Sequence, residues 1–446
     1  RKVTDWLEVG TNQSFTSSTT DFANTLSFNT GVVRSALLFP PTYGPNMDTT
    51  TADELNWLAA NPGAYVRSAI DQLNGSNYFS SSFVQIKFLK NFTFRQNLGL
   101  GYNVQDRKSY YGRETQEGKT PINGKASVGH NTWKSLTAES ILTYDNTFAK
   151  IHHVNVMGAC TLESSNWAND QQVATNFPDD LTGANDMSRA LDKATLSGDK
   201  GQQRLASFLG RVNYTLADKY ILTASFRSDG SSKFTDENKW ATFLSGALAW
   251  RASEEQFIKD LNIFSNLKFR VSYGETGNQG IGSYRINSQL DTANFPFGGS
   301  LSSGAADIAW RGPVDPNIKW ETTKQWNAGI DFGWFKNRLT LTVDFYWKKT
   351  RDLLQEVIIA PSNGFSNMLT NTGNVTNKGL EITIGATPID SNDWKWNLNG
   401  NIAFNKNSIG GLEGDQFART LWYGADNIFI QRNGCPIGAL FGYVED

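Results

Sequence analysis

The stretch from Thr370 to Phe404, TNTGNVTNKGLEITIGATPIDSNDWKWNLNGNIAF, decides the fold class of this chain. It contains two runs in which apolar and polar residues alternate, joined by a short polar turn around 390–393. One face of the first run is apolar, with Leu380, Ile382, Ile384 and Ala386. The polar face of the second run is rich in amides, with Asn397, Asn399, Asn401 and Asn405. A period of two over this length predicts long strands that are apolar on one face and polar on the other.

The same alternation recurs along the whole chain and predicts about thirteen or fourteen strands. Thirteen of them can be bounded, at 4–15, 78–88, 91–104, 131–144, 151–164, 203–216, 219–229, 239–251, 265–275, 320–334, 337–349, 376–388 and 393–406. Their connections include short turns, such as 217–218, and long segments, such as 105–130 and 165–202. Short turns that alternate with long loops are typical of an up-and-down antiparallel barrel in an outer membrane.

Two soluble β folds compete with this interpretation. Strands of a sandwich average about 5–6 residues, whereas the predicted strands approach the roughly 9–11 residues that cross a bilayer. A propeller requires a repeat of about 40–50 residues, and no such repeat is visible. Aromatic residues also gather at strand ends, as at Trp326, Trp334 and Trp347, where a barrel carries its interfacial girdles. The prediction is therefore an all-β, transmembrane, antiparallel barrel with a wet or plugged lumen.

Composition excludes several other classes of protein. The 446 residues carry a net charge of −2, which argues against nucleic-acid binding. No apolar run approaches the roughly 18 residues of a transmembrane helix. The two cysteines, Cys160 and Cys435, and the three histidines, at 130, 152 and 153, have no metal-ligand or catalytic spacing. We therefore expect no enzyme activity, no cofactor and no metal site at these residues, and the sequence leaves open whether the loops bind a metal ion.

Five motifs resemble those of one family, the SusC/RagA-type TonB-dependent outer-membrane transporters. They are RSDGSSKF (Arg227–Phe234), YGETGN (Tyr273–Asn278), NIKWETTKQWNAGIDF (Asn317–Phe332), YWKKTRDLL (Tyr346–Leu354) and NTGNVTNKGLEITI (Asn371–Ile384). They follow that family's order and spacing across 203–446. The resemblance implies a barrel of about 22 strands around an N-terminal plug. It also implies energised import of oligosaccharides or peptides, coupling to TonB, ExbB and ExbD, and a SusD-like surface lipoprotein as partner.

The chain departs from the family pattern at both ends. No plug domain or TonB box is recognisable, and the sequence closes on GYVED without the usual terminal aromatic residue. We therefore expect residues 1–446 to be part of the barrel domain, with a plug before Arg1 and about eight further strands after Asp446. The expected location is the outer membrane, crossed many times and surrounded by its lipids.

Substrate contacts are expected from aromatic residues in the long loops. Sugar rings stack on aromatic faces, and amides bind hydroxyl groups. The candidates are Trp167, Tyr110, Tyr111, Trp310, Trp422 and Tyr423. The competing interpretation is that these rings pack the loops. A peptide would use similar groups, so the sequence leaves glycan or peptide open.

Two alternative functions remain at this point. A passive porin or a structural surface barrel would have no energy coupling, and a plug domain would distinguish the importer from both. An outer-membrane enzyme would need a nucleophile next to a base, and the sequence shows no such motif.

Overall fold

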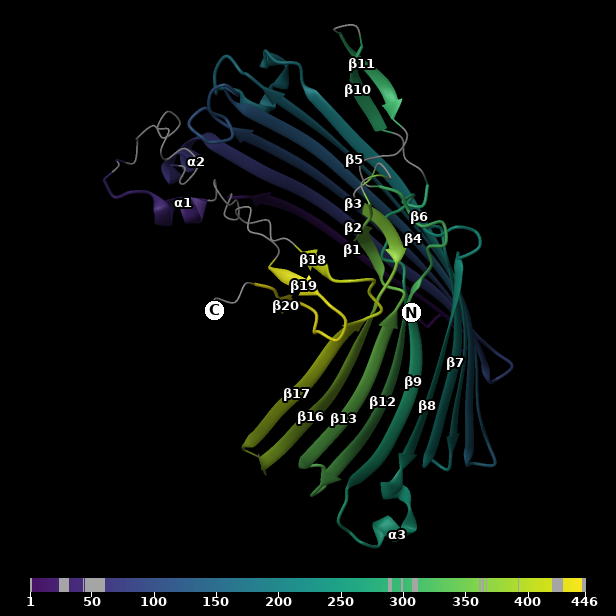
Figure 1. Cartoon of the computed structure of the whole chain (residues 1–446). Helices are drawn as coiled ribbons and strands as arrows, with labels where there is room; N and C mark the ends of the chain where they lie inside the picture. Colours follow the sequence, from purple (N-terminus) through teal and green to yellow (C-terminus); the bar gives the residue numbers. More distant parts are fainter. Residues whose placement is uncertain are drawn as a thin grey trace.

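The computed structural model describes residues 2–23, 32–42, 44, 61–287, 291–297, 300–306, 312–360, 362, 365, 367–391, 393–418 and 428–442. Its main feature is one antiparallel sheet of thirteen strands, in the order β1-β2-β3-β4-β5-β6-β7-β8-β9-β12-β13-β16-β17. Strands that follow one another along the chain are neighbours in the sheet, apart from small hairpins in the loops. Figure 1 shows the sheet curled into a curved wall, from β1 in purple to β17 in yellow.

All thirteen predicted strands are confirmed. The first half of the sheet comprises β1 (Leu7–Asp21), β2 (Ala69–Phe88), β3 (Phe92–Tyr111), β4 (Lys125–Phe148), β5 (His152–Thr175) and β6 (Thr195–Leu216). The second half comprises β7 (Tyr220–Ser231), β8 (Trp240–Arg251), β9 (Asn266–Asn278), β12 (Glu321–Trp334), β13 (Leu339–Arg351), β16 (Asn374–Asp390) and β17 (Lys395–Gly410). The meander confirms the predicted all-β, antiparallel barrel architecture.

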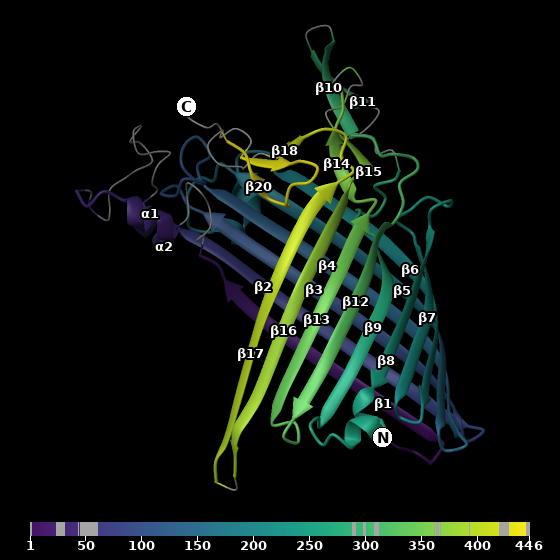
Figure 2. The ribbon, with the colours of Figure 1, turned by 60° about the horizontal axis from the view of Figure 1, so that its bottom comes forward.

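The two ends of the sheet differ in their connections (Figure 2). At one end lie short turns and the helix α3 (Gln256–Lys259). At the other end lie the helices α1 (Val32–Leu38) and α2 (Pro62–Ser68) and three small sheets. These sheets are β10 (Asp291–Phe297) with β11 (Ser300–Ala306), β14 (Leu354–Ile358) with β15 (Asn367–Asn371), and β18 (Gln416–Ala418) with β19 (Phe429–Gln431) and β20 (Ala439–Leu440). Among the helices of the described residues, none is long and apolar enough to cross a membrane.

The short turns hold residues in an uncommon backbone conformation. Ala217 and Asp218 have φ of 50° and 58°, and Leu89 and Lys90 have φ of 48° and 63°. This left-handed conformation is unfavourable for residues other than glycine. It is nevertheless used in these turns, because it reverses the chain direction in a way that matches the right-handed twist of the flanking strands. The ladders on both sides of each turn stabilise this geometry.

Strands β2 to β6 are much longer than predicted. They have 20, 20, 24, 24 and 22 residues, about twice what a bilayer crossing needs. The predicted loops at 105–130 and 165–202 were therefore too long, because the strands occupy half of each segment. The alternation of apolar and polar residues is lost there, because both faces become largely polar, as in Ser164–Gln172. The pairing of β4 with β5 nevertheless continues without a break.

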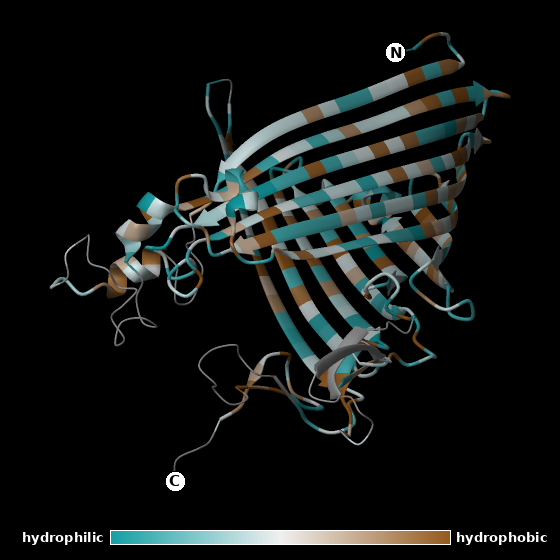
Figure 3. Cartoon of the chain, turned by 90° about the horizontal axis from the view of Figure 1, so that it is seen from above, coloured by the Kyte–Doolittle hydropathy of each residue, from teal (hydrophilic) through white to brown (hydrophobic). Residues whose placement is uncertain are grey.

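Figure 3 shows hydrophilic and hydrophobic residues alternating along the strands, and this alternation gives the sheet a polar face and an apolar face. Directly opposed residues share a face, so one row of the polar face runs through Arg211, Ser225, Ser245, Gly274, Gln325, Lys348, Asn377 and Asn407. The apolar face carries large side chains that remain exposed, namely Leu98, Leu136, Leu162, Phe208, Phe226, Leu244, Leu248, Trp326, Phe345, Ile384, Ile402 and Phe404. A belt this wide exceeds the apolar patches that soluble proteins expose, and it fits contact with lipid.

Loops at the long-connection end pack onto the polar face. Their cluster contains Phe234, Phe243, Ile281, Ile318, Trp320 and Leu369. The ring centroids of Phe234 and Trp320 lie 5.2 Å apart, and the indole nitrogen of Trp320 donates to the carbonyl of Lys239 at 3.1 Å. This cluster fixes part of the loop layer above the membrane-crossing part of the wall.

Candidate functional site

A hollow of about 830 Å³ lies on the polar face of the extended strands β2 to β6. Its lining includes Phe22, Asp71, Gln105, Arg107, Tyr111, Lys125, Ser127, Asn131, Asn169 and Gln171. These residues converge because the sheet alternation directs every second side chain of neighbouring strands to the same side. Amide and hydroxyl groups predominate, so the wall can bind a polar ligand through many hydrogen bonds.

One ion pair organises the upper part of this hollow. The guanidinium of Arg107 donates to both carboxylate oxygens of Asp71, at 2.8 and 2.6 Å. It also lies 5.2 Å from the ring centroid of Phe22, within cation–π range. The hydrogen bond to Asp71 raises the pKa of Arg107 above its ordinary value. Burial, followed by the charge of Asp71, raises the pKa of Tyr111, so its hydroxyl remains a hydrogen-bond donor.

The lower part of the hollow is uncharged on β3, β4 and β5. Gln105, Asn131 and Asn169 face one another across these three strands. The side-chain oxygen of Asn169 accepts from the backbone amide of Asp199 at 2.9 Å, which orients its amide group. In the described part of the chain, no group of three or more His, Cys, Asp or Glu residues could hold a metal ion.

The structure describes three of the six predicted contact residues, and all three lie on strands. Tyr111 lines the hollow. Trp167 lies on the polar face of β5, directly opposite Trp133 of β4. The prediction that these rings belong to loops was wrong, because β3 extends to Tyr111 and β5 to Thr175. Trp310, Trp422 and Tyr423 lie outside the described residues.

Tyr110 packs a loop, as the competing interpretation of the aromatic residues expected. Its side chain is only 4% exposed, on the face opposite the hollow. Its hydroxyl donates to Asp180 at 2.7 Å, and its ring meets Phe177 edge to face with centroids 5.6 Å apart. Burial raises the pKa of this tyrosine strongly. Tyr110 thus holds the segment around 177–184 against the wall.

Three site residues, Asp71, Arg107 and Trp133, were not predicted from the sequence. Asp71 and Arg107 lay in segments predicted as loops, and their pairing depends on the β2–β3 register, which no local pattern reveals. Trp133 lay within a predicted strand, where the alternation did place it on the same face as Asn131. That placement was the one available signal.

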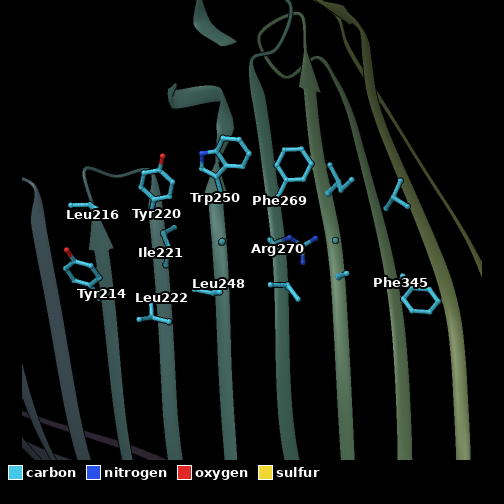
Figure 4. Close-up of a pocket in the computed structure, with 16 residues that line it drawn as sticks. Tyr214, Leu216, Tyr220, Ile221, Leu222, Leu248, Trp250, Phe269, Arg270 and Phe345 are labelled. Atoms are coloured by element: carbon cyan, nitrogen blue, oxygen red, sulfur yellow. The ribbon is translucent and has the colours of Figure 1, made fainter. Parts of the chain in front are cut away.

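A second depression, of about 780 Å³, lies on the apolar face near the short turns. Figure 4 shows its lining, which includes Tyr214, Tyr220, Trp250, Phe269 and Phe345. The polar ends of Tyr220 and Trp250 donate to Glu255, at 2.7 and 3.3 Å. Aromatic rings with their polar ends satisfied at a turn are typical of an interfacial girdle. This depression is suited to lipid rather than to a polar substrate.

The fold and its two faces define the class, a membrane-type up-and-down β-barrel wall with a polar hollow above its apolar belt. A family model described as "TonB dependent receptor-like, beta-barrel" matches residues 5–428. The chain belongs to this family, which is one of receptors rather than enzymes. The predicted resemblance to SusC/RagA-type transporters is confirmed.

Individual relatives agree with the family. The TonB-dependent receptor P3 of Formosa agariphila is 30% identical over 99% of this chain and 45% of its own length. The TonB-dependent receptor SusC of Bacteroides thetaiotaomicron is 37% identical over 53% of this chain and 26% of its own length. The solved RagAB peptide transporter has the same fold, with a TM-score of 0.84 and 21% identity over 98% of this chain and 48% of that one. The chain therefore spans less than half the length of each protein.

Proposed function

We propose that this chain forms much of the barrel of a TonB-dependent transporter that imports oligosaccharides or peptides across the outer membrane. The observation that carries the proposal is the hollow lined by Arg107, Tyr111 and Gln171. It lies on the polar face, above the apolar belt and on the side of the long connections. A ligand arriving from that side meets this wall before it reaches the membrane-crossing part of the sheet.

The proposal includes a closed barrel in the outer membrane. In the described sheet, β1 pairs only with β2 and β17 only with β16. Unpaired backbone groups cost several kcal/mol each in hydrocarbon, so two free sheet edges cannot face lipid. We propose that further strands of a longer protein pair with both edges, and that residues 1–446 belong to one barrel domain with a plug in its lumen.

Two partners belong to the proposal. TonB, which the description of the family names, would act with ExbB and ExbD to supply energy through the plug. A SusD-like lipoprotein would cover the long-connection end, where α1, α2 and the small sheets project beyond the wall (Figure 2). Gentle detergent extraction should recover the lipoprotein in near-equal amount.

The test compares uptake in cells with and without TonB. Cells that produce the full-length protein should accumulate labelled oligosaccharides or peptides only when TonB is present. Uptake that persists without TonB would reject the proposal in favour of a passive porin.

Two adjacent glutamines provide a matched pair of variants. Gln171 lines the hollow, while Gln172 points to the opposite face of β5. Gln171→Ala should slow uptake several-fold and Gln172→Ala should leave it unchanged. Equal effects of the two substitutions would exclude this hollow as the ligand path.

A further inference from the structure

Two tryptophans form a pair directly below the hollow. Trp133 of β4 and Trp167 of β5 are opposed in the register, one row below Asn131 and Asn169. Both lie on the polar face, and Trp133 is 41% exposed. On β3 to β5 the neighbouring rows of this face carry mostly amides and hydroxyls, so the two rings offer an apolar surface that a ligand can cover.

Two glycines allow these rings to lie against the sheet. A Cβ on Gly101 of β3 would lie 3.3 Å from Cζ3 of Trp133. A Cβ on Gly201 of β6 would lie within 2.5 Å of three ring carbons of Trp167. Glycine weakens a strand interior and often marks a place where another group approaches closely. At Gly201 the indole of Trp167 makes this approach, whereas the atom nearest to a Cβ on Gly101 would be Oγ of Ser135, at 2.5 Å.

The two rings lean in opposite directions and widen the aromatic surface. Trp133 leans toward β3 and Trp167 toward β6, because Gly101 and Gly201 lie on those strands. The two glycines are three strand spacings apart, roughly 14 Å. A molecule that stacks on both rings is therefore longer than one sugar ring.

The rows that flank the pair are uncharged on β3, β4 and β5, and on β6 the row above continues to Asp199. The row above contains Gln105, Asn131 and Asn169, and the row below contains Gly101, Ser135 and Ser165. Charged side chains or termini of a peptide would need charged partners at this level. Sugar rings instead present apolar CH faces to aromatic rings and hydroxyls to amides.

We propose that Trp133 and Trp167 form a stacking platform for a neutral oligosaccharide. This inference rests on the proposed function and narrows it from glycan or peptide to glycan. The hollow above the platform then binds the hydroxyl groups of the same chain. Gly101 and Gly201 are positioning residues, since they act through the orientation of the indoles.

The test measures binding to the full-length protein in nanodiscs by calorimetry and tryptophan fluorescence. The probes are neutral hexasaccharides of glucose in α-1,4, β-1,4 and β-1,3 linkage, of mannose and of xylose, together with a pool of hexapeptides. At least one hexasaccharide should bind. Trp167→Ala and Trp133→Ala should each weaken its binding at least tenfold, and Trp167→Phe should restore part of the affinity.

Glycine variants separate platform geometry from general damage. Gly201→Ala displaces the indole without removing it and should weaken binding severalfold. Gly210→Ala, on the opposite face of β6 with open space around its Cβ, should bind as the unaltered protein does. Heat-modifiable gel mobility establishes that each variant is folded.

Three results would overturn the inference. They are binding of none of the hexasaccharides, binding that is insensitive to both tryptophan substitutions, and binding of the peptides alone. TonB-dependent uptake of peptides would then leave the proposed function standing while the glycan platform falls. Uptake that is independent of TonB would instead reject the proposed function itself.

Discussion

Placing an arginine at the centre of the apolar face is the most direct test of the membrane assignment. On β13 the apolar face carries Leu339, Leu341, Val343, Phe345 and Trp347, and Val343 is the middle residue. Its cross-strand partners are Ile330 on β12 and Ile382 on β16. Val343→Arg therefore places a cation among aliphatic side chains that face lipid.

The expected loss of folding stability depends on how deep the substituted residue lies in the bilayer. Val343 lies four residues, roughly 13 Å along the strand, from Trp347 of the upper girdle and equally far from the end of the strand at Leu339. An arginine on the lipid face near the midplane costs about 2–4 kcal/mol, and near the interface about 0–1 kcal/mol. Val343→Arg should lower the free energy of unfolding by the larger amount and Leu339→Arg by the smaller.

A matched control lies on the other face. Thr383 of β16 is one position from Ile382 and is paired with Thr342 and Asn401, so its side chain faces the polar side. Thr383→Arg should change the free energy of unfolding by at most about 0.5 kcal/mol. Denaturant unfolding in lipid vesicles gives these differences.

Spin labels provide an independent measurement. The free cysteines Cys160 and Cys435 are first replaced by serine, and single labels are then attached at positions 343 and 344. The label at Val343→Cys should collide with oxygen dissolved in lipid, and the label at Asp344→Cys with a water-soluble nickel reagent. Equal accessibility of the two labels, or an equal cost of Val343→Arg and Thr383→Arg, would refute the assignment of the faces.

Three further predictions concern the wall, a turn and the loop layer. The hydrogen bond to Asp106 at 2.8 Å raises the pKa of His130, so the NMR-titrated pKa should exceed 6.5 and fall in Asp106→Asn. Its stabilising effect is present below the ordinary histidine pKa and is lost as pH rises through the folded pKa. Hydrogen bonds from Lys219 and then Tyr220 lower the pKa of Glu255 to about 2. Lys219→Met should therefore lower the unfolding temperature at neutral pH. The difference from the unaltered protein should shrink as pH falls from about 4 toward 2, where Glu255 becomes protonated. Phe234→Ala, in the buried loop cluster, should cost about 3–5 kcal/mol and expose 232–239 to proteases in the folded protein.

Each of these predictions has a result that would contradict it. An unchanged His130 titration in Asp106→Asn would show that the pair does not form. If Lys219→Met lowers the unfolding temperature equally at every pH, then the protonation of Glu255 is not coupled to stability as predicted. Phe335 is 73% exposed, so Phe335→Ala serves as the control for Phe234→Ala. Equal protease sensitivity of the two variants would contradict the packing of the loop layer.

The sequence predicted the membrane-crossing part of the wall well, because lipid imposes a period of two. At Leu341, Val343 and Phe345 every second residue must be apolar, and the pattern is visible without any partner strand. The upper ends of β4 and β5, at 125–130 and 165–175, escaped prediction, since apolar residues become sparse there while the backbone ladder continues. Tyr110 and Tyr111 lie in such an unpredicted strand end. They are neighbours in β3, yet Tyr110 packs a loop on one face and Tyr111 lines the hollow on the other.

The sequence by itself determined the class of fold, the number of strands in the described sheet, the orientation of the apolar face and the family. Each of these depends on local alternation or on short motifs that a single chain displays. Only the tertiary structure decided the candidate site. Asp71 meets Arg107 across 36 residues, and Trp133 meets Trp167 across 34, through the cross-strand register. The indoles lie close to Gly101 and Gly201 of the adjacent strands, and such contacts arise from the pairing of distant strands, which local periodicity does not encode.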